Sequence, residues 1–204
     1  MHLDQGDPTG REVTLWLDPV CPFTWNTAQW LHAVAEKAGF DVNWQLMSLA
    51  ILNEGQELPP PQQARMRDSQ RAGRLMAAIA QQNGTGRWKD AYFAFGKRYF
   101  DRSAPLDDDL AAHVLTAVGA TDITAAAATD ASLDDVIRRT HQAGQDALGE
   151  TGGSPILRID RHAFFGPVLT APPDQDASIA LFDAVATLAA VPQFSQLQRP
   201  RDAA

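Results

Sequence analysis

The sequence is poor in cysteine, in positive charge and in long apolar runs, and each shortage excludes a class of protein. Cys21 is the one cysteine in 204 residues, so the chain cannot form an internal disulfide, and nothing indicates an oxidising compartment. No apolar run approaches the roughly 18 residues of a membrane span, and the first eight residues lack the basic end and apolar stretch of a signal peptide. The formal net charge of -8 argues against nucleic acid and anionic membranes as partners. We therefore expect a cytoplasmic protein.

The single cysteine stands at a junction between a strand and a helix. Val13–Leu17 is an apolar run typical of a central parallel strand, and a helical run from Asn26 to Lys37 follows the cysteine. Pro22 suits the first position of a helix, where a missing N–H group has no cost. Unpaired N–H groups and the helix dipole favour an anion at this place, and they lower cysteine pKa values from about 8.5 into a range of roughly 3.5–7.5. The pattern predicts a reactive thiol, with a buried structural cysteine as the alternative.

The rest of the chain alternates between β and helical character. An alternating segment at Asp41–Met47 predicts a second strand, parallel to the first, and Ser48–Pro61 is expected to be a loop. Five helices are expected next, over residues 62–82, 87–100, 105–118, 123–128 and from an N-cap at Ser132 to Leu148. Two strands at 156–159 and 162–165 form a hairpin, and the last helix spans 176–191.

This order predicts a discontinuous α/β domain with a helical insertion. The α/β domain is expected to comprise residues 12–58 and 150–192, and the insertion residues 59–149. Residues 1–11 and 193–204 are expected to be flexible tails.

Two proline dipeptides connect this layout to a known superfamily. Cys21-Pro22 at a strand–helix junction, with Ser154-Pro155 just before a returning strand, resembles the thioredoxin superfamily, and the helical insertion resembles its DsbA-like branch. The resemblance implies an α/β thioredoxin-like fold with an all-helical insertion between the second and third strands. It also implies that Pro155 is a cis-proline beside Cys21, and that the backbone of Ser154 binds a thiol substrate as an extended strand. A trans proline at a strand start is the alternative.

Four segments narrow the resemblance: 18–22 (DPVCP), 47–53 (MSLAILN), 141–144 (HQAG) and 164–169 (FFGPVL). In this order and spacing they resemble the mycothiol-dependent nitroreductase group of DsbA-like proteins, over roughly residues 13–198. The resemblance implies a cytoplasmic oxidoreductase that takes electrons from the small thiol mycothiol. No flavin or nicotinamide motif is present, and no Gly-x-Gly-x-x-Gly occurs.

One position departs from the pattern of the group. Its oxidoreductases have a second cysteine three residues after the first, where this chain has Thr24. A dithiol attacks a mixed disulfide from within, whereas Thr24 can only donate a hydrogen bond to the Cys21 thiolate. We therefore expect monothiol chemistry, in which a second external thiol resolves the mixed disulfide. A kappa-type thiol transferase or isomerase, or a non-catalytic thiol-binding relative, are the alternatives.

Further side chains are candidates for the thiol site. His141 lies on the apolar side of its helix, and is either a core histidine or a group that faces the thiol. Ser48 and Asn53 follow the second strand at the ligand-binding edge of the sheet, or cap the loop there. Phe23 could form an apolar lip beside the thiol, whereas Trp25 is expected in the core.

The remaining features suggest structural roles. The aromatic residues between Trp88 and Phe100 are expected to pack the helices, and an exposed aromatic face on the helical insertion would support a homodimer. The five histidines include no pair at the spacing of metal ligands, so no metal is expected.

Overall fold

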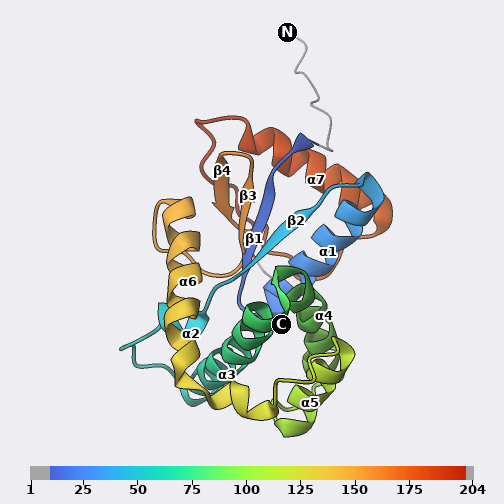
Figure 1. Cartoon of the computed structure of the whole chain (residues 1–204). Helices are drawn as coiled ribbons and strands as arrows, with labels where there is room; N and C mark the ends of the chain where they lie inside the picture. Colours follow the sequence, from blue (N-terminus) through green and yellow to red (C-terminus); the bar gives the residue numbers. More distant parts are fainter. Residues whose placement is uncertain (1–9, 201–204) are drawn as a thin grey trace.

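The computed structural model describes residues 10–200, and it places a four-stranded sheet between helical layers (Figure 1). The strands are β1 (Val13–Leu17), β2 (Val42–Leu46), β3 (Ile156–Ile159) and β4 (His162–Phe165), in the spatial order β2-β1-β3-β4. β1 pairs with β2 in parallel and with β3 antiparallel, and β3 pairs antiparallel with β4. All five residues of β1 are buried, as expected for a central strand.

The two faces of β1 belong to different core clusters, because successive side chains of a strand point to opposite faces. Leu15 and Leu17 lie in the main core, together with Trp30 of α1 (Pro22–Ala38) and Phe182 of α7 (Gln175–Ala189). Trp16 lies in a smaller cluster, which packs against Ala147 and Leu148 of α6 (Asp134–Leu148). In Figure 1 the sheet accordingly separates α1 and α7 from α6. This is the α/β thioredoxin-like fold that the sequence predicts.

All the residues between β2 and β3 are helical or lie in loops, as the DsbA-like expectation requires. After the short α2 (Leu49–Leu52) come α3 (Pro60–Asn83), α4 (Thr85–Tyr99) and α5 (Asp108–Ala117), which Figure 1 shows together below the sheet. Two 3-10 turns (Ala125–Thr129 and Ala131–Leu133) lead from α5 into α6. Arg74 of α3 and Asp134 of α6 form an ion pair at 2.7 Å, which links the first long helix after β2 to the last helix before β3.

Several predicted element boundaries are wrong, and side-chain caps at Ser48, Asp107 and Asp130 determine three of the observed starts. Ser48 accepts a hydrogen bond from the Ile51 N–H, so the expected loop contains a helical turn. Asp130, not Ser132, accepts the capping bond ahead of α6, and the segment expected to be a helix at 123–128 is a 3-10 turn. α5 begins three residues later than expected, since Asp107 caps it.

The aromatic residues of α4 pack against α1. Trp25 stacks on Phe100 at 5.7 Å between ring centroids, and it lies edge-on to Tyr92 at the same distance. Trp25 is therefore a core residue, as expected. The exposed large apolar side chains among residues 10–200 are Phe165, Val191 and Leu197, which lie outside the helical block, so they provide no exposed aromatic face there. The homodimer stays an untested prediction.

Two expectations concern the ends of the chain. The predicted tail at 1–11 falls mostly on residues 1–9, and that at 193–204 ends in residues 201–204, both outside the described residues. Residues 193–200 contain no helix or strand. Within the described range, no helix is long and apolar enough to cross a membrane.

Candidate functional site

Cys21 is the N-cap residue of α1, and Pro22 occupies the first helical position. The cysteine backbone is extended (φ -80°, ψ 116°), and its N–H donates to the Asp18 carbonyl at 3.2 Å, closing a tight turn after β1. The side chain is nearly enclosed, with 5% of Cys21 exposed. The junction predicted from the sequence is present, and it presents one thiol at a helix N-terminus.

The second proline dipeptide lies directly against this thiol. The Ser154–Pro155 peptide bond is cis. The Cys21 Sγ–H donates to the Ser154 carbonyl at 3.5 Å. The Ser154 hydroxyl accepts a bond from the Asp18 N–H at 2.8 Å and contacts the Thr24 hydroxyl at 2.7 Å. The fold thus brings together Cys21, Thr24, Ser154 and Pro155 from segments about 130 residues apart.

The pKa of Cys21 differs from the sequence prediction in direction. Burial raises the pKa of the thiol above its ordinary value, and this outweighs the lowering by the Thr24 hydroxyl and by the N–H groups of Thr24 and Phe23. The nearby Asp18 carboxylate raises it further. The prediction of a lowered pKa was wrong because the sequence showed the helix N-terminus but not the enclosure around it.

A buried carboxylate beneath the thiol was missed at the sequence level. Asp18 is fully buried, and its two oxygens accept bonds from the N–H groups of Val20 and Leu49 and from the Ser69 hydroxyl. Burial raises the pKa of Asp18, and the three donors oppose that rise. Asp18 is the first residue of the 18–22 segment, so the sequence could have indicated its place beside the thiol. Ser69 of α3 has no sequence pattern that links it to this site.

Ser48 and His141 join the edge of the same network. The Ser48 hydroxyl caps α2 and lies 3.4 Å from the Ser69 hydroxyl, while the Ser48 N–H donates to His141 Nδ1 at 3.4 Å. Burial lowers the pKa of His141, followed by the positive charge of Arg138, and the ring accepts this bond in its neutral form. His141 is thus a core histidine with a partner, which fastens α6 to the segment after β2.

Asn53 has the capping role that the sequence left open beside a role in ligand binding. Its side-chain amide donates to the Leu49 carbonyl at 2.8 Å and to Met66 Sδ at 3.6 Å. The side chain is therefore engaged in closing α2 against α3. A direct contact with a thiol ligand stays a prediction.

An aromatic side chain lies on the outer side of the cis-proline turn. Phe165 is 47% exposed, and a Cβ atom added at Gly153 would stand 3.2 Å from its ring. The following segment crosses α1 just beyond the thiol, because Thr27 donates to the Pro167 carbonyl at 2.7 Å. Phe23, also partly exposed, lies on the same helix end. These positions supply apolar surface close to Cys21.

Two cavities of the molecule lie away from the thiol site. Cavities of about 570 and 290 Å³ open beside the far end of α1 and on α4, and Cys21 lines neither. Within the described residues, no group of three histidine, cysteine or acidic side chains is placed to hold a metal ion. The groups available for chemistry at the site are the enclosed thiol of Cys21, the hydroxyls of Thr24 and Ser154, and the backbone of Ser154.

A protein-family model matches most of this sequence. The model described as mycothiol-dependent nitroreductase Rv2466c matches residues 20–199. The chain belongs to the Rv2466c-like family. The chain is also similar to the uncharacterized protein Rv2286c of Mycobacterium tuberculosis (strain ATCC 25618 / H37Rv). The two sequences are 32% identical over 200 residues, and the match covers 94% of this chain and 83% of that one.

Solved structures place this Rv2466c-like protein among DsbA-like folds. The "probable DsbA oxidoreductase SCO1869" of Streptomyces coelicolor superposes with a TM-score of 0.58 at 18% identity, covering 93% of this chain and 94% of that one. A 2-hydroxychromene-2-carboxylate isomerase gives a TM-score of 0.59 at 15% identity, covering 86% and 95%. At these identities the likeness shows the fold alone, and the family match identifies the protein as a member of a thiol oxidoreductase family.

Proposed function

We propose that this Rv2466c-like protein is a cytoplasmic thiol-dependent oxidoreductase that works with Cys21 alone and uses mycothiol to reduce a small-molecule or disulfide acceptor. The observation that carries the proposal is the contact between Cys21 Sγ and the Ser154 backbone at the cis-proline turn. The family model adds the co-substrate, because its description names mycothiol. The single cysteine and this co-substrate together support the location in the cytoplasm.

The proposed reaction needs two external thiols for each acceptor. Cys21 and a first mycothiol give up two electrons and two protons to the acceptor and become joined in a mixed disulfide. A second mycothiol then attacks that disulfide, which releases the Cys21 thiol and mycothiol disulfide. With a disulfide acceptor, Cys21 attacks one sulfur and expels the other as a thiol. A first mycothiol then frees Cys21 and forms a disulfide with the bound half, and a second mycothiol releases that half as a thiol and gives mycothiol disulfide.

The hydroxyls have positioning roles in this scheme. Thr24 stands where a resolving cysteine would stand, and its hydroxyl bonds to that of Ser154. We infer that the pair holds the cis-proline turn against the thiol, while Thr24 also lowers the pKa of Cys21. The 5% exposure of Cys21 supports a small thiol rather than a protein disulfide as the reacting partner, because little of the residue is open to solvent. Pro22, Phe23 and Phe165 would border the incoming molecule.

A transferase or isomerase of the kappa type is the second candidate. There the hydroxyl at the helix start activates the thiol of the bound co-substrate, and no mixed disulfide forms. The specific observation in its favour is the Thr24–Ser154 hydroxyl pair beside an enclosed, protonated cysteine. In that case Cys21 would be dispensable and Thr24 essential.

The deciding experiment compares Cys21→Ser and Thr24→Val in a mycothiol-dependent reduction assay, with mass spectrometry of the protein after exposure to mycothiol disulfide. We expect Cys21→Ser to lose turnover by about a thousandfold or more, as removal of a nucleophile does, and to form no adduct. Thr24→Val should keep the adduct at a reduced rate. Full turnover by Cys21→Ser would refute the proposal and favour the kappa type, and an inert wild-type thiol would indicate a non-catalytic relative.

A further inference from the structure

A concave site that Cys21 does not line gathers positive charge in a chain whose net charge is -8. It is the cavity of about 290 Å³ on the outer side of α4 and α5. Three elements contribute cationic or titratable side chains to its lining: the last turn of α4, the following loop, and α5. These side chains are Lys97, Arg98, Arg102 and His113.

Among residues 10–200, no carboxylate forms an ion pair with Lys97, Arg98 or Arg102. The one carboxylate of the cavity lining, Asp90, is 65% exposed and pairs at 3.5 Å with Lys89, outside the lining. Arg98 Nε is buried and has no hydrogen-bond partner among the described residues. Burial lowers the pKa of His113, and the charges of Arg98 and Arg102 lower it further, as expected where cations face one another without an anion between them.

The helix dipole explains only part of this cluster. Cations are favourable in the last turn of a helix, which accounts for Lys97 and Arg98 on α4. It does not account for Arg102 in the loop or for His113, which lies inside α5. The larger cavity, by contrast, is lined by Glu36 and Asp41 as well as Lys89, so its charge selects no particular ligand.

The chemistry of the lining identifies the ligand class. Guanidinium groups present paired N–H donors that match the oxygens of a carboxylate or phosphate, and Lys97 adds a further positive charge. Part of the wall is apolar: Phe93 and Ala94 complete the lining, and the Phe93 ring packs against Trp25 at 5.7 Å between ring centroids. We propose that this cavity binds a small oxyanion, a carboxylate or phosphate group carried on a compact apolar body. The site is independent of the function proposed for Cys21.

The test is a two-dimensional amide NMR titration of the full chain with inorganic phosphate and, separately, with benzoate. Ionic strength is held constant with chloride. We expect saturable shifts confined to residues around 90–102 and 113. Saturation by phosphate alone would identify a phosphate ligand, and tighter binding of benzoate a carboxylate on an apolar body.

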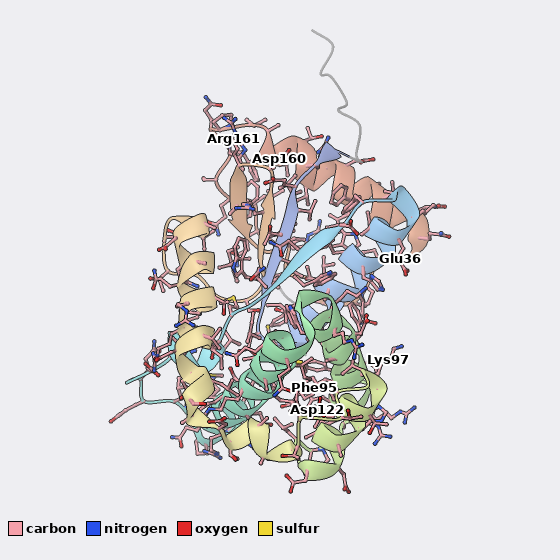
Figure 2. The ribbon with its side chains drawn as sticks, in the orientation of Figure 1. Glu36, Phe95, Lys97, Asp122, Asp160 and Arg161 are labelled. Atoms are coloured by element: carbon pink, nitrogen blue, oxygen red, sulfur yellow. The ribbon has the colours of Figure 1, made fainter. Side chains whose placement is uncertain are left out.

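Matched charge variants decide whether the cavity is responsible. Arg102→Gln, at an exposed loop position, should weaken binding by about tenfold or more, the usual effect of one charge-assisted hydrogen bond. Arg98→Gln should do the same. Arg161→Gln removes the same charge at the β3–β4 turn, far from Lys97 in Figure 2, and should change nothing. Shifts that stay linear in anion concentration, or equal affinities of Arg102→Gln and Arg161→Gln, would overturn the proposal.

Discussion

At Cys21, two effects of the local structure act in opposite directions. The start of α1 supplies N–H groups that favour the thiolate, while burial and the carboxylate of Asp18 favour the thiol. The carbonyl of Ser154 also favours the thiol, because it accepts a hydrogen bond from the Sγ–H group and its partial negative charge would repel a thiolate. The balance lies on the side of the thiol, so we expect deprotonation of Cys21 to accompany the approach of a reaction partner.

The first prediction concerns the titration of this residue. Thiolate absorbance in the ultraviolet should appear in the folded protein at a higher pH than in the chain unfolded by denaturant, because the folded pKa is raised. Folding stability from this group is then present below the unfolded pKa, and it is lost as pH rises through the folded pKa. The single cysteine makes the signal unambiguous. A folded thiol that titrates before the unfolded one would contradict the enclosure of Cys21.

At the scale of elements, the approach of α4 to α1 depends on a glycine. A Cβ atom at Gly96 would overlap the six-membered ring of Trp25, so only glycine permits the two helices to lie this close. Trp25 is also held by its Nε1–H, which donates to Asp101 at 3.0 Å, just after the end of α4. The indole therefore fixes the helical block against the helix that begins with the thiol.

The second prediction uses two glycines of α4. Gly96→Ala should reduce the free energy of unfolding by about 1–3 kcal/mol, the usual cost of overpacking, because the indole would have to move. Gly86→Ala is the control: an added Cβ there meets no atom within 4 Å, so the change should be neutral or stabilising by up to about 1 kcal/mol. Chemical denaturation measures both. Equal effects of the two substitutions would show that helix propensity, and not the contact with Trp25, dominates.

At the scale of the whole molecule, the buried residue Asp18 connects four segments. Its oxygens bind the turn before Cys21, the start of α2 and Ser69 of α3, while its backbone N–H binds Ser154 ahead of β3. The sheet and the helical block are thus joined directly beneath the thiol. The division of the chain at residues 59 and 149 stays a prediction, and this network is where the two parts would meet.

The third prediction removes one donor from that carboxylate. Ser69→Ala should cost about 1.5–3 kcal/mol of stability at neutral pH, the range for a hydrogen bond to a charged group. Ser69 lowers the pKa of Asp18, so the difference between variant and wild type is present above that pKa and shrinks as pH falls through it. Ser178→Ala, which removes a buried hydroxyl bonded to a carbonyl, should show a pH-independent loss. A pH-independent loss for Ser69→Ala would argue against an ionised Asp18.

Much of the fold was predictable because it rests on local patterns. The apolar run of β1, the proline after Cys21 and the αL residue Gly39 determine a strand, a helix start and a helix end within thirty residues. The hairpin of β3 and β4 was equally local. Element ends were less predictable, since the caps at Ser48 and Asp130 depend on which of several polar residues bonds to a free N–H group.

The sequence by itself determined the class of fold, the position of one thiol at a helix start and, through Thr24, the lack of a second. Tertiary structure alone decided the electrostatics of that thiol. The enclosure of Cys21 and the contact with Ser154 involve segments more than 130 residues apart in the chain, and Ser69 reaches Asp18 from a helix with no pattern that marks it. Burial is a property of what packs around a residue, and it outweighed the helix N-terminus that the sequence made visible.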